Sequence, residues 1–464
     1  MITVRPRFFL RTVCRATPFI AVLIIGAAQP LHTAEAAPVA PQAVQLSETL
    51  SSRTGRWVST WGTAQPLTSV DAPVWMKAPP QSDRPSPVPP IPVRLKDQTV
   101  RMIIRTSVAG HALRVQLSNA QGMAPVTIGA AHIALSGEGA RIVPNSDWAL
   151  TFGGRASFSI PPGAVIVSDP IDIKVGPLSR MTVSLYVPNE TSRLTVHSLG
   201  LHTTYVAPGN QTNLISLKNA STNLSYFWLS GIEVWASCEA ASLVAFGDSI
   251  TDGYATSPDI DHAWPALLSE SLSSRKRERP IGVVNVGISG NRVLHEGVGT
   301  SALARFDRDV LARPGVRWVL FLEGINDISF PAIPGAPAEE RISSADLIAG
   351  YREFIEKAHL YGIKVIGGTL LPWEGVWTFS QSAEAIRQDV NRWIRSSGSF
   401  DRVVDFDAVT RDPQNPTRLR PAFDSGDHVH PNDAGNQAMA AAITSAFFEE
   451  PGSSPLDRKS SACQ

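Results

Sequence analysis

The second half of the chain repeats one pattern: short apolar segments alternate with longer stretches of helical spacing. The expected strands are 243–247, 282–286, 317–322, 364–369 and 403–406. The expected helices are 263–273, 301–312, 344–361, 383–396 and 432–448. Strands joined by helical crossovers form a parallel sheet that helices cover on both faces. We therefore predict a three-layer α/β/α domain of flavodoxin-like type, with about five strands, over residues 240–450.

Residues 56–236 have a different pattern. Short strands separated by turns rich in Gly, Asn and Pro, with almost no helical periodicity, favour an all-β, sandwich-like accessory domain. Within it, 99–107 and 112–118 are expected to pair as a hairpin. The proline-rich stretch 74–93 is predicted to be irregular or extended.

The N-terminus has the features of an export signal. Four arginines precede an apolar stretch, 18–28, which is too short to span a bilayer, and 34–37 offers a small-residue cleavage site. We predict a signal peptide (1–37), a linker (38–55) and a C-terminal tail (451–464). The mature protein would be secreted or periplasmic without stable membrane insertion; a membrane anchor is the alternative.

Charge and cysteine content limit the classes of partner. Lys+Arg and Asp+Glu both number 41, so nothing in the composition favours nucleic acid or an anionic membrane. Of three cysteines, Cys14 lies in the predicted signal. Cys238 and Cys463 remain, and a disulfide between them is permitted in an exported chain.

Small and polar residues follow the first three predicted strands. Ser249 comes directly after the strand 243–247, where a nucleophile can lie at a helix N-terminus with its own N–H facing a developing oxyanion. Gly290 lets a backbone N–H approach a substrate oxygen, and the Asn326 amide can complete an oxyanion hole. Taken singly, each can also be an ordinary capping or turn residue.

A carboxylate and an imidazole follow the fifth strand. Asp427 and His430 are three residues apart, which in a helical turn places them on one face, and Pro431 suits the first position of the next helix. His430 would accept the proton of Ser249 while Asp427 supports the imidazolium. His428 is the alternative base. The Asp-x-His-x-His spacing also permits a metal site, but no third ligand with clear spacing lies nearby.

Together these blocks give the chain a resemblance to the SGNH hydrolases, also called GDSL esterases and lipases. The residues that carry the resemblance are Ser249, Gly290, Asn326, Asp427 and His430. It implies a Ser-His-Asp triad and an oxyanion hole built from the N–H groups of Ser249 and Gly290 and the Asn326 amide. The G-x-S-x-G elbow of α/β-hydrolases is absent around Ser249. The N-terminal half resembles the all-β domain of secreted bacterial members likened to xylan esterases.

The resulting hypothesis is a serine esterase that needs no metal or organic cofactor. The expected substrate is a small-molecule or glycan ester, with acetyl esters of carbohydrate favoured over longer acyl esters. Candidate substrate contacts are Asp248, Trp264, Trp373 and Trp377; Trp264 can instead pack the first helix, and the two others can be loop packing. A non-catalytic carbohydrate-binding protein and an acyltransferase stay open, and the sequence leaves the oligomeric state unknown.

Overall fold

The computed structural model describes residues 54–66, 73–77, 92, 94–275 and 279–448. The predicted signal peptide, nearly all of the linker, the C-terminal tail and Cys463 lie outside the described residues. Cys238 is disulfide-bonded, but its predicted partner is not among them. In the described part of the chain, no helix is both long and apolar enough to cross a membrane.

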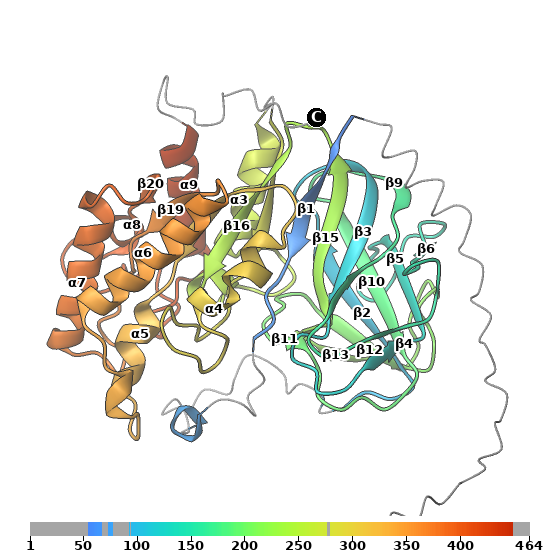
Figure 1. The fold of residues 1–464 in the computed structure, drawn as a ribbon, viewed down its shortest axis with the longest axis horizontal. Helices are drawn as coiled ribbons and strands as arrows, with labels where there is room; N and C mark the ends of the chain where they lie inside the picture. Colours follow the sequence, from blue (N-terminus) through green and yellow to red (C-terminus); the bar gives the residue numbers. More distant parts are fainter. Residues whose placement is uncertain (1–53, 67–72, 78–91, 93, 276–278, 449–464) are drawn as a thin grey trace, which may run out of the picture. The chain divides into compact units, whose positions relative to one another are not determined.

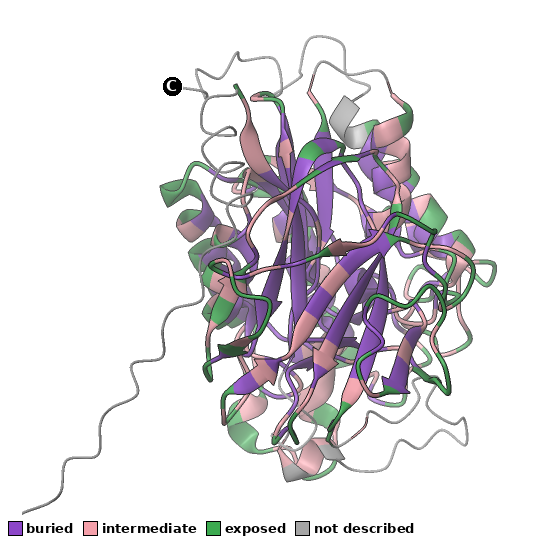
Figure 2. Cartoon of the chain, turned by 90° about the vertical axis from the view of Figure 1, so that its right-hand side faces the viewer, coloured by how far each residue is buried: buried purple, intermediate pink, exposed green. Residues whose placement is uncertain are grey.

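The first half of the chain folds into two antiparallel sheets that enclose one apolar core (Figure 2). One sheet has the order β1-β15-β3-β8, with β9 also on β3; the other has the order β13-β12-β2-β10-β5-β6. Val58, Val115 and Ile232 from the first sheet and Met102 and Val183 from the second are fully buried. The predicted all-β, sandwich-like architecture is therefore confirmed.

The bounds of these strands are as follows. The first sheet contains β1 (Arg56–Gly62), β3 (Gly110–Ser118), β8 (Val165–Val167), β9 (Ile171–Val175) and β15 (Leu229–Ala236). The second contains β2 (Gln98–Arg105), β5 (Ala130–Leu135), β6 (Trp148–Ala149), β10 (Arg180–Val187), β12 (Thr204–Pro208) and β13 (Ser221–Asn223). Two small pairs are β4 (Val126–Ile128) with β7 (Phe158–Ile160), and β11 (Val196–His197) with β14 (Tyr226–Phe227).

The predicted hairpin between 99–107 and 112–118 is wrong. β2 and β3 belong to different sheets, so the chain crosses the sandwich between them. Polar residues in the connection make this crossing possible: Thr106 Oγ1 donates to the Gly176 carbonyl, and the Ser107 N–H donates to Thr60. Within the proline-rich stretch, the described residues Val74–Lys77 form a short 3₁₀ helix, η1.

The second half is the predicted parallel sheet, with the order β17-β16-β18-β19-β20 (Figure 1). This is the flavodoxin-like order, in which the first strand lies between the second and third. The strands are β16 (Ala241–Gly247), β17 (Ile281–Asn285), β18 (Val316–Leu322), β19 (Lys364–Gly368) and β20 (Arg402–Val404). They read as near-continuous apolar runs because helices bury both faces.

Two groups of helices form the outer layers. α3 packs on α9, and α4 and α7 both contact α6. The longer helices are α3 (Trp264–Ser274), α6 (Ser344–Leu360), α7 (Gln381–Ser396) and α9 (Asp433–Phe448); the shorter ones are α2 (Ser249–Asp252), α4 (Ala302–Phe306), α5 (Ile325–Ser329) and α8 (Phe406–Thr410). A π-helical turn, η2 (Asp307–Leu311), extends α4, while η3 (Phe330–Ala332) and η4 (Ala338–Glu340) are 3₁₀ turns.

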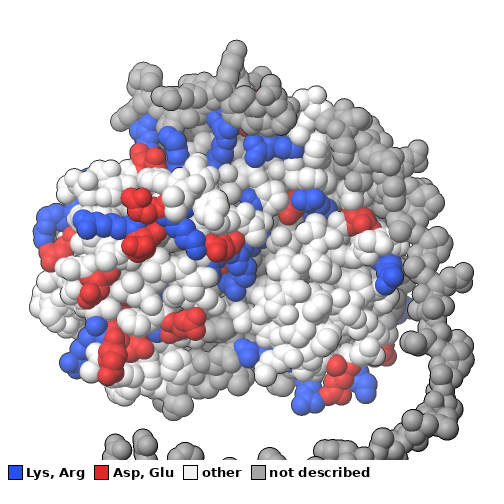
Figure 3. All heavy atoms as spheres, in the orientation of Figure 1, with Lys and Arg blue, Asp and Glu red and all other residues white. Residues whose placement is uncertain are grey.

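The sandwich contacts the parallel sheet at its β17 edge through β1. The carbonyl of Ser59 accepts a hydrogen bond from Ser242 Oγ, and the Ser59 N–H donates to the Pro314 carbonyl. A side chain at Gly282 would collide with the Ser59 carbonyl, so glycine permits this close approach. On the face drawn in Figure 3, acidic and basic side chains intermingle, and neither sign dominates.

Candidate active site

Ser249 begins a one-turn helix at the carboxyl end of the central strand β16. The Asp248 side chain caps this helix by accepting a hydrogen bond from the Ile250 N–H at 3.0 Å. This sharp change from a buried strand to a helix leaves Ser249 7% exposed, at the edge of the sheet where parallel α/β folds bind ligands. The sequence motif therefore folds locally as predicted.

Two hydrogen bonds join Ser249, His430 and Asp427 in a row. Ser249 Oγ lies 2.7 Å from His430 Nε2, and His430 Nδ1 lies 2.7 Å from Asp427 Oδ2. The contacts of Nδ1 and Nε2 fit a neutral ring with its proton on Nδ1. The ring of Tyr254 covers the imidazole, with centroids 4.4 Å apart.

The Asp427 carboxylate is held by its own loop. Its Oδ1 accepts hydrogen bonds from the backbone N–H groups of Val429 and His430, at 3.1 and 2.9 Å. Burial opposes ionisation of this carboxyl, but the hydrogen bonds from the His430 side chain and from the two N–H groups outweigh burial and hold its pKa well below the usual range. Asp427 is therefore a carboxylate at every ordinary pH.

The predicted helical turn around Asp427 and His430 is wrong, although the two side chains do meet. Residues 427–430 form a series of bends, and α9 begins at Asp433 instead of at Pro431. Pro431 pairs with Asp424 in an isolated bridge, which closes the loop. Asp427 accepts hydrogen bonds from the N–H groups of this loop, and these bonds, not helical spacing, bring the Asp427 and His430 side chains together.

Asn326 and Gly290 line the same cavity as Ser249. Asn326 lies in the first turn of α5, and one of its amide hydrogens is donated to the Asn291 carbonyl at 2.9 Å. That bond fixes the plane of the amide and leaves its second hydrogen for another acceptor. Gly290 has a φ of +80°, a conformation that favours glycine.

The cavity beside Ser249 has a volume of about 290 Å³ and a mainly apolar lining. Besides Ser249, His430, Tyr254, Gly290 and Asn326, it is lined by Ser289, Ile325, Ser329, Phe330, Ile333, Trp373, Val376, Trp377, Thr378 and Val429. The two predicted tryptophans therefore do reach the site. Trp377 is 53% exposed, whereas Trp373 is enclosed.

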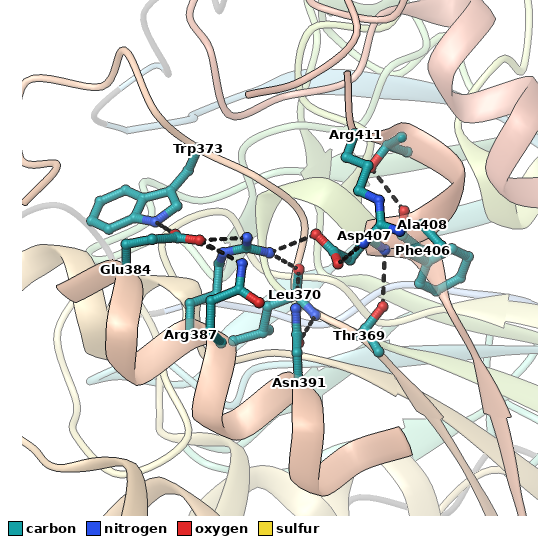
Figure 4. A network of polar contacts seen from close by, with 12 residues as sticks. Thr369, Leu370, Trp373, Glu384, Arg387, Asn391, Phe406, Asp407, Ala408 and Arg411 are labelled. Carbon is teal, nitrogen blue, oxygen red and sulfur yellow. Dashed lines mark hydrogen bonds and ion pairs between the residues drawn. The ribbon is translucent and has the colours of Figure 1, made fainter. Parts of the chain in front are cut away.

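Trp373 is a fixed part of this wall. Its indole N–H donates to Glu384 at 3.0 Å, and Glu384 is paired with the buried Arg387, which also binds Asp407 (Figure 4). Arg387 further donates to the Leu370 carbonyl at the end of β19. A buried polar network of this kind rigidifies its members. The hydrogen bonds behind Trp373 therefore fix the shape of the cavity on this side.

Three of the residues considered from the sequence do not line the cavity. Trp264 is fully buried in the core of the α/β half and packs near Phe406, so it is the helix-packing residue and not a substrate contact. Asp248 is 1% exposed, caps α2 and does not line the cavity. His428, the alternative base, is bonded through Nδ1 to Asp424 at 2.7 Å and does not line the cavity.

Sequence reasoning missed a residue that joins the ends of β16 and β17. The guanidinium of Arg305, in α4, is fully buried and donates to the carbonyls of Gly247 and Val286 at 3.0 and 2.7 Å. It also donates to Asn291 Oδ1 at 2.7 Å, so it supports the residue that orients Asn326. An arginine inside a helical stretch has no motif that would have revealed this role.

Two buried carboxyl groups near the site have raised pKa values. Burial raises the pKa of Asp248 to about 7 and that of Asp327 to about 6. Both are held by backbone N–H groups, Asp327 by those of Val293 and Leu294.

Among the described residues, no group of three or more His, Cys, Asp or Glu side chains is arranged to hold a metal ion.

This combination of fold and site defines an α/β/α hydrolase domain. Residues 245–438 match the model of the GDSL-like Lipase/Acylhydrolase family, and the protein is an ester hydrolase. The resemblance seen in the sequence is thereby confirmed. No curated protein matches the chain.

Solved structures are similar to part of the chain. A GDSL-like lipase from Bacteroides thetaiotaomicron is 23% identical; the match covers 44% of this chain and 86% of the lipase, with a TM-score of 0.34. An acetylxylan esterase from Geobacillus stearothermophilus is 24% identical, with 44% and 93% covered and a TM-score of 0.36.

Proposed function

We propose that this hydrolase is a serine esterase in which Ser249 is the nucleophile, His430 the general base and Asp427 the group that supports the imidazolium. The observation that carries the proposal is the row of two 2.7 Å hydrogen bonds from Ser249 to Asp427 at the wall of a cavity. Nucleophile, base and orienting carboxylate within hydrogen-bond reach are the arrangement that activates a serine.

The reaction proceeds in two halves. Ser249 Oγ attacks the ester carbonyl and gives its proton to His430 Nε2, while the N–H groups of Ser249 and Gly290 and the free amide hydrogen of Asn326 bind the oxyanion. His430 then protonates the departing alcohol, which leaves an acyl group on Ser249. Water, deprotonated by His430, attacks this acyl-enzyme and releases the acid.

The cavity favours an apolar acyl chain of several carbons. Its volume of about 290 Å³ is far more than an acetyl group needs, since one water takes roughly 30 Å³. Its wall is formed largely by side chains such as Ile325, Phe330 and Val376, which offer no hydrogen bonds to sugar hydroxyls. We therefore place the acyl group, and not a sugar, in this cavity.

Acetyl esters of carbohydrate are the second candidate, and Trp377 is the observation that favours them. Its half-exposed ring at the cavity wall offers an aromatic face on which a sugar ring can stack. In this arrangement the acetyl group alone would enter the cavity. Transfer of the acyl group to a sugar instead of water would use the same residues.

Hydrolysis of p-nitrophenyl acetate, butyrate and octanoate by the wild type and Ser249→Ala tests the proposal. We expect butyrate to be the best substrate and the variant to lose all turnover above background. Ser271→Ala, which removes a hydroxyl on α3 that bonds Thr444, is the matched control and should keep wild-type rates. Retained hydrolysis in Ser249→Ala would refute the assignment of Ser249 as the nucleophile. A strict preference for the acetate ester would favour acetyl esters of carbohydrate as the substrate.

A further inference from the structure

One histidine of the sandwich is buried against the α/β half. His197, in β11, is 4% exposed, and its ring makes three polar contacts. Nδ1 lies 2.7 Å from the carbonyl oxygen of Ala64. Nε2 lies 2.9 Å from Asp252 Oδ1 and 3.1 Å from the Leu199 carbonyl oxygen.

These contacts determine the protonation of the ring. Carbonyl and carboxylate oxygens can only accept hydrogen bonds, so both ring nitrogens of His197 must donate, and only the imidazolium can do so. Burial by itself lowers the pKa of His197, but Asp252 and the carbonyls of Ala64 and Leu199 outweigh burial and raise it above its ordinary value. His197 and Asp252 are therefore a buried ion pair.

Asp252 connects this ion pair with two segments of the site, the helix of Ser249 and the loop of Gly290. It is the last residue of α2, the helix that begins at Ser249. Its second oxygen, Oδ2, accepts hydrogen bonds from the Ser289 N–H at 3.0 Å and from Ser289 Oγ at 2.7 Å. Ser289 directly precedes Gly290, so one carboxylate joins the helix of the nucleophile to the loop of a proposed oxyanion donor.

We propose that His197 is a positioning residue for the oxyanion hole: its imidazolium fixes Asp252, and Asp252 fixes the helix of Ser249 against the loop of Gly290. The proposal rests on the esterase mechanism above, because it assigns the Gly290 N–H to the oxyanion. It gives the accessory domain a part in catalysis, because the imidazolium that holds Asp252 belongs to a residue of the sandwich.

Other contacts hold the two halves together without His197. Ser59 bonds Pro314 and Ser242, as described above. Arg105 pairs with Glu270 of α3, and Arg313 donates to the carbonyls of Ser230 and Thr63. Loss of His197 should therefore change the geometry around Asp252 without separating the sandwich from the α/β half.

Two amide substitutions divide the contacts of His197 between them. The side-chain nitrogen of Asn takes the position of Nδ1, and that of Gln the position of Nε2. His197→Asn therefore keeps the bond to Ala64 and loses the one to Asp252, while His197→Gln does the reverse. We expect His197→Asn to lower kcat for p-nitrophenyl butyrate by roughly tenfold or more, which is less than loss of a whole oxyanion donor. KM should stay within about twofold, and His197→Gln should recover most of the rate.

His132 supplies the matched control. It also bonds an aspartate of the sandwich, Asp147, at 2.8 Å, but both residues lie within that half. His132→Gln, in which the side-chain nitrogen takes the position of Nε2, loses the bond from Nδ1 to Asp147 and should leave kcat unchanged. Equal rates for folded His197→Asn and His197→Gln, or a wild-type kcat in His197→Asn, would overturn the proposal.

A fluorophosphonate probe separates this proposal from the proposed function. Its reaction forms a bond between Ser249 Oγ and phosphorus, expels fluoride and places a phosphonyl oxygen in the oxyanion hole. No labelling of the wild type at Ser249 would refute the esterase mechanism and the positioning role with it; wild-type labelling in His197→Asn would refute only the latter. If His197→Asn does not fold, Ser289→Ala decides, because it removes one bond to Asp252 without changing the sandwich and should slow labelling severalfold.

Discussion

Two histidine–aspartate pairs lie at the two ends of the one-turn helix α2, and they differ in what the second ring nitrogen meets. In the pair His430–Asp427, Nε2 faces the Ser249 hydroxyl, which can both donate and accept a hydrogen bond. In the pair His197–Asp252, both nitrogens face oxygens that only accept. In the proposed mechanism the first ring therefore gains and loses a proton in each cycle, whereas the second ring stays protonated and supports Asp252. The same two side chains would thus serve as a proton relay or as a support, according to their neighbours.

The largest effect should come from breaking the first pair at its carboxylate. Asp427→Asn removes the charge that supports the imidazolium and allows the wrong tautomer of His430, which should lower kcat by roughly 10²–10⁴. Asp424→Asn changes a similar pair three residues away, whose histidine does not line the cavity, and should cost less than about threefold. Steady-state kinetics on p-nitrophenyl butyrate measure both. Similar losses of kcat in the two variants would show that the assignment of His430 as the base is wrong.

Asn326 tests whether His197 acts through the oxyanion hole. Asn326→Ala removes one donor and should lower kcat by roughly 10²–10³ in the wild-type background. In the His197→Asn background we expect a smaller further loss, because the hole is already distorted and contacts within one network are not additive. A double-mutant cycle measures this coupling. Fully additive losses would mean that His197 acts on something other than the oxyanion hole.

The sequence predicted what depends on local pattern. Five apolar segments with helical spacers were sufficient for the parallel sheet, and Ser249, Asn326 and His430 became candidates because each comes after a predicted strand. The β2–β3 hairpin was wrong because alternation of side chains does not show which sheet a strand joins. Trp264 was offered as a substrate contact because a residue at a helix start can face either the core or the cavity.

Residues that support the site from a distance have no sequence signal. His197 lies 55 residues from Asp252 in a stretch of the sandwich without a motif, and Arg305 lies 58 residues from Gly247. Each is found only when the fold brings a buried cation to the backbone or carboxylate it serves. Motifs thus point to the candidate reacting groups, whereas the groups that hold them in place depend on tertiary contacts.

The smallest expected effect concerns stability and comes from the second pair alone. Because the folded-state pKa of His197 is raised above 6.5, its contribution to stability is complete below about pH 6.5 and is lost as the pH rises through the folded-state value. His197→Gln cannot titrate, so the difference in unfolding free energy between wild type and variant should shrink as the pH increases from 6 to 9. Arg105, His202, Asp261 and His262 line the small cavity next to His197, but both proteins contain them and their titration largely cancels. Denaturant unfolding at several pH values measures the difference, and a difference that stays constant or grows would show that the pKa of His197 is not raised in the folded protein.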